Sequence, residues 1–440
     1  MTLSAAGAAV VKRWFDAASP AKETLTPSPA EEALAGRLVE AGMAHPLPAV
    51  STGPVHVVIP FHGDHRDLAA TVAGVRSQRP ASITVVDDGN PSPPSLPTDV
   101  VIVRHGTSGG PAAARNTGWR RLVADGLIAD RSAVDDAAPD DTDDVIVFID
   151  AGVTTGADDL QRLAGHLGDE SVGAAAPRVA TEPGPALIDR YEAHFSPLDL
   201  GPDPSPVGLG RRVTYVPTAC LAVRASQVVD LDGFDDQLRF GEDVDFIWRL
   251  VDRASVRYDP SVIVRHGARV GLRAFARQRV QYASAAAPLA ARHADAVHPW
   301  RSNLLGAAGV ALASLGHPFV ALGVGLLPVG DLRDKLDTTV TPTATAIRLL
   351  AIGHGWSLRS FAETAARSWI VFALPLAVRS RVARRWIVAG WARRALTTTD
   401  PALLALGVID DVAYGTGVGL GAWRQRSIRA LVPAITRRWN

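Results

Sequence analysis

The chain has 440 residues, of which 47% are hydrophobic and 20% charged, and its formal net charge is zero. This length is enough for two or three folded units around at least one large core, and the balanced charge gives no reason to expect nucleic acid as a partner. A single cysteine, Cys220, excludes an internal disulfide and agrees with a reducing, cytoplasmic environment.

The first fifty residues contain one predicted helix. Pro29–Gly42 carries its apolar residues along one side, and Ser28 is in position to cap it. Residues 1–50 are too few for a domain of their own. We expect them to form a helical segment packed on the unit that follows.

From residue 51 to residue 297 the sequence alternates between short, mostly apolar runs and helical segments. Such runs are typical of parallel strands that are buried on both faces of a sheet. The predicted strands are Val55–Ile59, Ile83–Val86, Val100–Val103, Val145–Ile149, Val172–Val179, Ala219–Val223 and Ser261–Val264. The predicted helices are Asp64–Ser77, Gly109–Leu122, Ala157–Leu167 and Glu242–Asp252. This alternation predicts an α/β fold with a mostly parallel sheet and helices on both faces, and the proline-rich stretch Pro183–Val207 predicts a long surface loop or lid.

After about His298 the strand pattern disappears, and residues 298–440 are predicted to be helical. Ser302–Gly330 has 29 residues without a charge, long enough to span a membrane, but it contains six glycines and two prolines. A kinked span, a re-entrant hairpin and a buried helical pair all remain open. Eleven arginines against three aspartates follow between Arg379 and Asn440, interleaved with apolar runs and tryptophans. We expect this tail to attach the chain to lipid at the cytoplasmic face of the cell membrane, with a soluble helical layer as the alternative.

Three groups of carboxylates lie beside apolar segments. Asp87 and Asp88 end the second predicted strand, and Asp150 ends the fourth. Glu242 and Asp243 open an apolar helix. Each group alone has an ordinary explanation as a turn, a strand end or a helix cap. Because ligands of open α/β sheets bind at the carboxyl edge of the strands, the three groups together predict a site for a sugar nucleotide and its metal.

Two segments are placed to contact the nucleotide. Asp87 or Asp88 can accept the N3–H of a uracil ring, although an ordinary Asp-Gly turn has the same sequence. Gly109–Asn116 opens a helix with small side chains that let the backbone approach a ligand. Arg115 and Asn116, one turn further on, can meet ribose or phosphate oxygens. A well-capped surface helix is the alternative for this segment.

A divalent metal that bridges a nucleotide diphosphate needs hard ligands. Asp150 can supply one oxygen, whereas Gly152 cannot supply another through a side chain. His266 follows the last predicted strand and opens on the same sheet edge as Asp150, where a neutral imidazole is a competent ligand. Arg265 or Arg269 is expected to neutralise the diphosphate. A purely structural role for Asp150 and for His266 remains the alternative.

Taken together, these motifs resemble the family-2 glycosyltransferases of the GT-A fold. The resemblance extends over roughly residues 55–270, and its motifs are Pro60-Phe61, Val86-Asp87-Asp88-Gly89, the Ala-Arg-Asn block at 114–116, Asp150 and Glu242-Asp243. Within this family, Arg277–Tyr282 and Ala285–Leu289 with the helical tail are similar to the glycosyltransferases of the mycofactocin system. Those enzymes extend a peptide-derived redox cofactor with glucose units.

The resemblance implies an inverting transfer of a hexose, glucose from UDP-glucose, to a hydroxyl group of mycofactocin or its precursor. Asp243 would be the catalytic base, with Glu242 beside it. The residues expected to bind the nucleotide sugar are Pro60, Asp87, Asp88, Arg115, Asn116 and Arg265, and those expected to hold Mg²⁺ or Mn²⁺ are Asp150 and His266. The family's usual Asp-x-Asp is Asp-x-Gly in this chain, which weakens the expected metal site.

Other functions fit part of the same sequence. A membrane-attached glycosyltransferase acting on a cell-envelope glycan would have the same motifs. A sugar-nucleotide-forming nucleotidyltransferase has a similar sheet but would have a Gly-rich, basic loop after the first strand, and Pro60–Asp64 offers none. Gly152 favours a third alternative, a catalytically silent homologue that only binds the nucleotide sugar.

Overall fold

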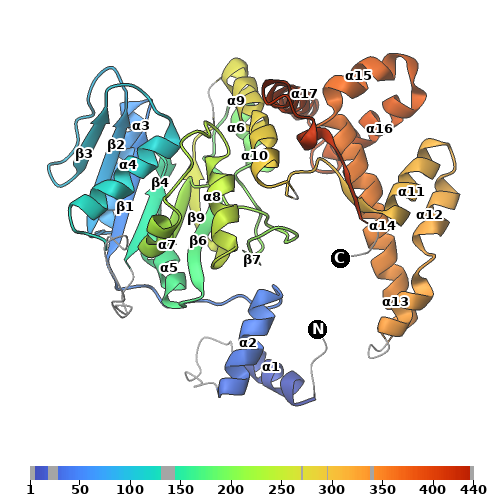
Figure 1. Cartoon of the computed structure of the whole chain (residues 1–440), viewed down its shortest axis with the longest axis horizontal. Helices are drawn as coiled ribbons and strands as arrows, with labels where there is room; N and C mark the ends of the chain where they lie inside the picture. Colours follow the sequence, from blue (N-terminus) through green and yellow to red (C-terminus); the bar gives the residue numbers. More distant parts are fainter. Residues whose placement is uncertain are drawn as a thin grey trace.

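The computed structural model describes residues 5–17, 28–129, 144–268, 271–294, 296–336 and 341–436. Arg269, one of the expected diphosphate contacts, lies outside these residues. An N-terminal helical segment, a sheet with its helices and a C-terminal helical region follow one another along the chain (Figure 1). The expected fold class is confirmed in this arrangement.

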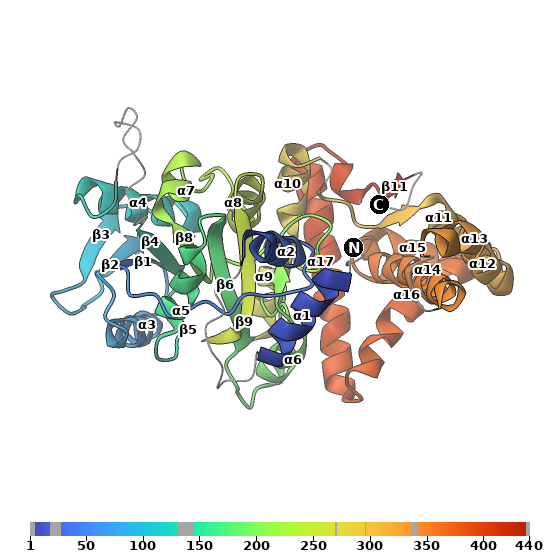
Figure 2. The same ribbon diagram turned by 90° about the horizontal axis from the view of Figure 1, so that it is seen from below.

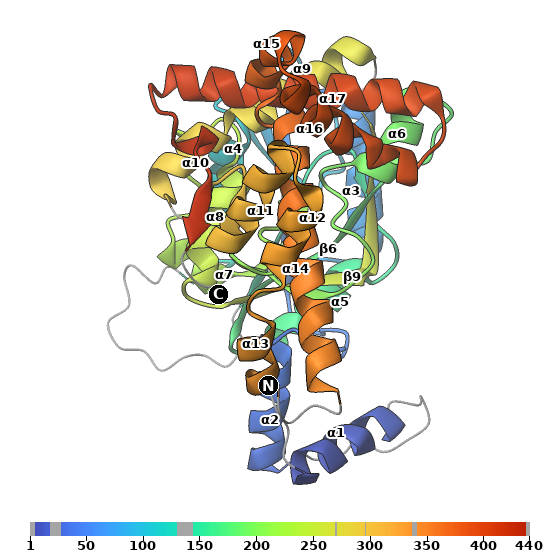
Figure 3. The same cartoon turned by 90° about the vertical axis from the view of Figure 1, so that its right-hand side faces the viewer.

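The N-terminal segment has two helices, α1 (Ala5–Ala17) and α2 (Pro29–Glu40). The carboxylate of Glu31 accepts a hydrogen bond of 2.8 Å from the backbone N–H of Ser28, which fixes the start of α2. Only Leu38 of α2 is buried, and Figures 1 and 3 show both helices extending away from the sheet. Within the described residues, the segment contacts the sheet unit from the end of α2 onward, where Val39 and Leu47 line a small cavity with Pro206 and Tyr258. The expected packed layer is therefore limited to this end.

The main sheet has the strand order β3-β2-β1-β4-β8-β6-β9-β5, and β7 pairs with β9. β1, β2, β3 and β4 pair in parallel, whereas β8 lies antiparallel between β4 and β6. The strands are β1 (Val55–Phe61), β2 (Ser82–Asp88), β3 (Val101–His105), β4 (Val145–Ile149), β5 (Val153–Thr154), β6 (Val172–Thr181), β7 (Ser205–Pro206), β8 (Cys220–Arg224) and β9 (Ser255–His266). The carboxyl ends of β1, β2 and β4 consequently meet at one edge.

Helices cover both faces of this sheet, and successive residues of β1 enter different cores. Val57 and Ile59 pack in one core, whereas Val58 packs in the other, which explains the unbroken apolar runs of the inner strands. α4 lies so close to β1 that a Cβ atom at Gly118 would be 2.2 Å from Cγ1 of Val58. The helices of this unit are α3 (His65–Ser77), α4 (Pro111–Ala124), α5 (Asp159–Gly165), η2 (His166–Gly168), α6 (Leu187–Phe195), α7 (Ala225–Asp230) and α8 (Glu242–Val251).

The proline-rich stretch is not a plain loop, because it contains α6 and β7. Ile188, Tyr191 and Glu192 of α6 are buried, so this helix belongs to the folded body. The prolines flank α6 and do not interrupt it, and for this reason the count of prolines was misleading.

The C-terminal region is helical, but the long uncharged stretch is not one span. It breaks at Gly316, whose φ of +90° ends the first helix, and the chain turns back into a second helix. A short parallel pair, β10 (Arg301–Asn303) and β11 (Ala434–Thr436), also departs from the all-helical expectation. The helices are α9 (Leu272–Ser284), α10 (Ala286–Arg292), α11 (Leu304–Ser314), α12 (Pro318–Gly325), α13 (Val329–Lys335), α14 (Pro342–Ala366), α15 (Ile370–Arg379), α16 (Arg381–Ala392), η3 (Arg394–Leu396), α17 (Pro401–Arg424) and η4 (Arg429–Leu431).

Among the described residues, α17 is the one helix that is long and apolar enough to cross a membrane, and half of its most apolar stretch is buried in the protein. α14 and α15 would pass the same test together, but they are bent by 90° at the break between them. Figure 2 shows α17 beside α9 at one end of the sheet, with α11 to α16 further out. The C-terminal region therefore both touches the sheet unit and extends beyond it.

Candidate active site

A cavity of about 920 Å³ lies at the carboxyl edge of β1, β2 and β4. Its opposite wall comes from α9, α10 and α17 of the C-terminal region. Seven of the ten predicted site residues line this cavity: Pro60, Asp88, Arg115, Asp150, Glu242, Asp243 and His266. The remaining three, Asp87, Asn116 and Arg265, do not line it.

Arg115 of α4 occupies the centre of the carboxylate cluster. Its Nη1 donates to Oε1 of Glu242 at 2.9 Å, and its Nη2 donates to Oδ1 of Asp150 at 2.7 Å. Burial alone would lower the pKa of this guanidinium, but Asp150 and Glu242 raise its pKa above the ordinary value. Arg115 was expected to reach the ribose or the phosphates. It lines the cavity, where that contact stays a prediction, and it joins a strand end and a helix start that are far apart in the sequence.

Asp243 lies half-buried in the cavity at the first turn of α8. Its Oδ1 accepts a hydrogen bond of 2.8 Å from the backbone N–H of Val244. Burial and the adjacent carboxylate of Glu242 raise the pKa of Asp243 to about 7, because both disfavour the charged form more than Arg115 favours it. A carboxyl group with this pKa exchanges a proton readily near neutral pH, as a general base must.

Gly241 fixes where this helix begins. Its φ is +79°, and a Cβ atom at this position would lie 2.8 Å from Cβ of Ala285 at the start of α10. Glycine is needed on both grounds, the left-handed backbone and the close approach. The motif that first drew attention to this region is thus a tight turn that presents Glu242 and Asp243 to the cavity.

The two aspartates after β2 have separate tasks. Asp87 is fully buried outside the cavity, where its Oδ2 accepts from Nε of Arg104 at 2.7 Å and its Oδ1 accepts from Nδ2 of Asn90 at 2.6 Å. With both oxygens occupied, Asp87 holds the turn and does not fit its expected role as a nucleoside ligand. The Asp-Asp-Gly motif alone does not indicate which of its two aspartates faces the cavity.

Asp88 lines the cavity and anchors the loop that leads into α4. Its carboxylate accepts hydrogen bonds from the backbone N–H groups of Gly109 and Gly110 at 2.8 and 2.9 Å, and from the side chains of Ser108 and His105. Burial alone would raise the pKa of Asp88, but these hydrogen bonds lower it below the ordinary value. Asp88 therefore shapes this part of the cavity through the loop that it holds.

Asn116 and Arg265 also differ from expectation. The Nδ2 of Asn116 donates to the carbonyl of Phe234 at 2.7 Å, and its Oδ1 accepts from the N–H of Phe234 at 2.9 Å. The buried amide of Asn116 thus satisfies both backbone groups of Phe234 and fixes the chain before α8. It is therefore not available as a ribose ligand. Arg265 is exposed on β9, and strand alternation turns it away from the face that His266 presents to the cavity.

His266 and Asp150 share the cavity with Gly152 of the Asp-x-Gly motif. The Nδ1 of His266 lies 2.8 Å from the carbonyl oxygen of Gly267, an arrangement that directs Nε2 elsewhere. A Cβ atom at Gly152 would lie 3.9 Å from Oδ2 of Asp67. Within the described residues, no group of three or more histidine, cysteine or acidic side chains is arranged to hold a metal ion.

Sequence reasoning missed the residues that close the cavity on its far side. Tyr215, Tyr282, Tyr414 and Arg367 all line it, and they come from separate parts of the chain. Three of the five tyrosines of the protein are therefore gathered in one cavity. The sequence could have indicated the role of Tyr414 only if the position of α17 beside the cavity had been known.

No family model matches the chain. In a search of curated proteins, the chain is 33% identical over 437 residues to the "Pre-mycofactocin glycosyltransferase" of Mycobacterium tuberculosis, strains CDC 1551 / Oshkosh and ATCC 25618 / H37Rv. The alignment covers 91% of this chain and 87% of the relative. The chain belongs to the pre-mycofactocin glycosyltransferase family. It is an enzyme that transfers a glycosyl group, and the resemblance to the mycofactocin-system glycosyltransferases is confirmed.

Solved glycosyltransferase structures are similar to this one at low sequence identity. The mannosyltransferase PcManGT from Pyrobaculum calidifontis, solved with GDP-Man and Mn²⁺, has a TM-score of 0.47 and 15% identity, covering 95% of this chain and 98% of its own. Residues 1–349 of TarS from S. aureus give a TM-score of 0.37 and 11% identity, covering 85% and 92%. These likenesses concern the fold alone.

Proposed function

We propose that this pre-mycofactocin glycosyltransferase family member transfers glucose from UDP-glucose, with inversion, to a hydroxyl group of pre-mycofactocin. The observation that carries the proposal is Asp243, a carboxyl group in the cavity whose pKa is raised to about 7 by burial and by Glu242. The name of the relative supports the acceptor. The donor and the inverting course follow from the family resemblance of the motifs.

The cavity residues divide between the two substrates. The nucleotide would lie over the Asp88-anchored loop and Pro60, beside the start of α4. The acceptor would enter from the side of Asp243, whose carboxylate takes the hydroxyl proton while the oxygen attacks the anomeric carbon. Because the attack comes from the face opposite the leaving diphosphate, the product has the inverted configuration. Arg115 holds Glu242 and Asp150 in place at the wall of the cavity.

A divalent cation fits this donor set if it arrives with the nucleotide. Mg²⁺ is commonly held by one or two carboxylates together with substrate phosphates, so a complete protein cage is not required. Asp150 would supply an oxygen and His266 its Nε2, and the cation would stabilise the charge of the departing diphosphate. The absence of a side chain at Gly152 leaves this site weaker than an Asp-x-Asp site.

The proposed function is tested with purified protein, pre-mycofactocin and a panel of nucleotide sugars with and without Mn²⁺. We expect UDP-glucose to raise the melting temperature and to yield a glucosylated product, because a true donor binds the folded state. Transfer to an envelope glycan in place of pre-mycofactocin would favour the envelope alternative. Thermal stabilisation by the donor without any turnover would identify a silent nucleotide-sugar-binding homologue.

The role of His266 gives a prediction of its own. With one carboxylate in the Asp-x-Gly motif, His266→Ala is expected to raise the Mn²⁺ concentration needed for half-maximal activity several-fold. The Mn²⁺ affinity of the protein–UDP complex, followed by the paramagnetic relaxation of water, should fall in parallel. His65→Ala is the matched control, since His65 does not line the cavity. An unchanged Mn²⁺ titration would leave His266 with a structural role only.

We also propose that the C-terminal helices bind the cytoplasmic face of the cell membrane. At the junction of α15 and α16, exposed apolar side chains such as Phe372, Leu376 and Val378 adjoin the exposed Arg381 and Arg385. Apolar area combined with basic charge favours an anionic bilayer surface. Trp386 does not take part, because its Nε1 donates to Oγ of Ser314 inside the helical region.

Cell fractionation tests this location. The full chain is expected in the membrane fraction at low salt, and substitution of both Arg381 and Arg385 by Gln should lower its retention on vesicles with anionic lipid. Release by high salt alone would indicate peripheral binding, and release only by detergent a spanning helix. Recovery in the soluble fraction at low salt without detergent would contradict the proposal.

A further inference from the structure

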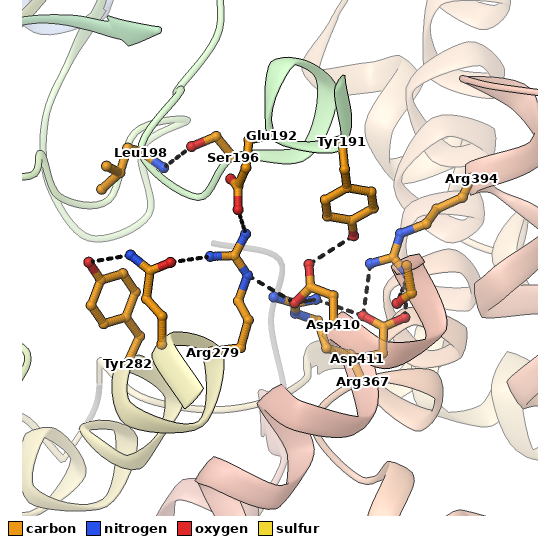
Figure 4. A network of polar contacts seen from close by, with 12 residues as sticks. Tyr191, Glu192, Ser196, Leu198, Arg279, Tyr282, Arg367, Arg394, Asp410 and Asp411 are labelled. Atoms are coloured by element: carbon orange, nitrogen blue, oxygen red, sulfur yellow. Dashed lines mark hydrogen bonds and ion pairs between the residues drawn. The ribbon is translucent and has the colours of Figure 1, made fainter. Parts of the chain in front are cut away.

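A buried network of charged side chains joins the C-terminal helices to the sheet unit (Figure 4). In it, Asp410 and Asp411 of α17 face arginines from three other segments. Its members are Glu192 on α6, Arg279 on α9, Arg367 after α14, Arg394 on η3 and the two aspartates, with the hydroxyl of Tyr191 donating to Asp410 at 2.8 Å. The three arginines and the three acidic residues give the network a formal net charge of zero.

Arg279 and Arg394 make their ion pairs inside this network, and Arg279 also lines the cavity. Arg279 is buried and contacts Glu192 and Asp410, whereas Arg394 donates to Asp411 and to the carbonyl of Gly407. These contacts lock α17 against α6 and α9. Breaking a buried ion pair is costly, so the position of α17 is well defined.

Arg367 is different, because only part of its guanidinium is engaged. Its Nη1 donates to Oδ1 of Asp411 at 2.6 Å and to Oδ1 of Asp410 at 3.1 Å. In the described part of the chain, all hydrogen bonds of its guanidinium come from Nη1, and the side chain is 30% exposed and lines the cavity. The guanidinium carbon of Arg367 lies 4.2 Å from the ring centroid of Tyr414, and this cation–π contact helps to fix the orientation of the planar guanidinium group.

Tyr414 brings this pair to the catalytic end of the cavity. Tyr215, Tyr282, Tyr414 and Asp243 line the same cavity. Burial raises the pKa of Tyr215, and Asp243, Tyr414 and Tyr282 raise it further, as expected for groups that share this space. No hydrogen-bond partner of the Tyr414 hydroxyl is found among the described residues. The cavity that contains Asp243 is therefore also lined by two side chains with donor groups, Arg367 and Tyr414, both from the C-terminal region.

We propose that Arg367 and Tyr414 bind the acceptor, so that the C-terminal helices form the acceptor half of the active site. This inference rests on the proposed function. The chemistry defines the acceptor class: a compound that offers a carbonyl or carboxylate oxygen to the planar fork of Arg367 and presents a flat apolar part to the surrounding tyrosines. The buried aspartates do not touch the acceptor and act as positioning residues for Arg367.

Two matched pairs of variants test the proposal through binding, which does not depend on turnover. Arg367→Lys keeps the charge but loses the fork, and Tyr414→Phe keeps the ring but loses the hydroxyl. Arg394→Lys and Tyr191→Phe make the same chemical changes in the same network away from the cavity. Calorimetry measures the Kd of pre-mycofactocin for each protein, and the thermal shift with UDP-glucose measures donor binding.

We expect the Kd of pre-mycofactocin to rise about tenfold in Arg367→Lys and several-fold in Tyr414→Phe, as the loss of a hydrogen bond to a charged or fixed donor predicts. The UDP-glucose shift should stay the same. The control variants also loosen the network around α17, so each should raise the Kd of pre-mycofactocin clearly less than its counterpart in the cavity does. Equal losses in the controls, or no loss in any variant, would overturn the proposal. Failure of the wild type to turn over any donor would instead refute the proposed function while leaving the binding result readable.

Discussion

Asp243→Asn is expected to lower the turnover number at least ~100-fold while leaving the affinity for UDP-glucose nearly unchanged. The substitution keeps the size of the side chain and its hydrogen bond from Val244, but it removes the group that accepts the proton. The pH dependence gives a second readout. Asp243 works as a base only when it is deprotonated, so wild-type kcat/KM is retained above the pKa of about 7 and falls as the pH drops through that value.

In Asp243→Asn, the fall in kcat/KM below about pH 7 (the acidic limb of the pH profile) should be absent. Asp245→Asn is the matched control, because Asp245 lies two residues away on α8 but is bound by Arg249 at 2.8 Å and His293 at 2.9 Å outside the cavity. This control should lower stability without removing the limb. A near wild-type rate in Asp243→Asn would exclude Asp243 as the base and leave Glu242 as the remaining carboxylate on this helix that faces the cavity.

Arg115→Met is expected to destabilise the fold by about 3–5 kcal/mol, the usual cost of leaving partners of a buried ion pair uncompensated. The variant retains a long apolar stem but leaves Glu242 without its partner at 2.9 Å and Asp150 without its partner at 2.7 Å. Chemical denaturation at pH 7 measures the loss in the free energy of unfolding. The loss should shrink at lower pH, where Glu242, whose pKa is already raised by burial, becomes neutral.

Arg120→Met on the same helix is the control for this effect. Arg120 pairs with Asp232 at 2.8 Å, but its side chain is 50% exposed, so its loss should change stability by less than about 1 kcal/mol. Adding Glu242→Gln to Arg115→Met should recover part of the lost stability, since it removes one of the orphaned charges. Equal effects of the two arginine substitutions would show that Arg115 is not the electrostatic centre of the site.

The sequence predicted the site best where a carboxylate directly follows an apolar strand. Apolar runs located the inner strands, and the rule that parallel strands end at one edge predicted that Asp88 and Asp150 lie close together. Asp243, at the start of α8, was predicted to join them as a carboxylate beside an apolar segment. Motif position could not tell which side of a turn a carboxylate faces. Asp87 and Asp88 are adjacent, yet one is enclosed by Asn90 and Arg104 while the other lines the cavity.

The far wall of the cavity could not be predicted, because it depends on how distant helices pack. Arg367 and Tyr414 lie more than a hundred residues beyond Asp243 and carry no motif. The membrane prediction counted eleven arginines after residue 378, and one of them, Arg394, is paired with Asp411 inside the protein. Composition counts charges without saying which of them are paired.

The close contact of α4 with β1 has a consequence for how this enzyme can be damaged. Gly118 leaves no room for a methyl group against Val58, and Arg115 stands one turn earlier on the same helix. A mutation to alanine at 118 would lift the helix and displace the guanidinium while every substrate-contacting side chain kept its identity. Inactive alleles of this gene can therefore arise at a residue that has no chemistry, and they would be overlooked by any inspection confined to the cavity wall.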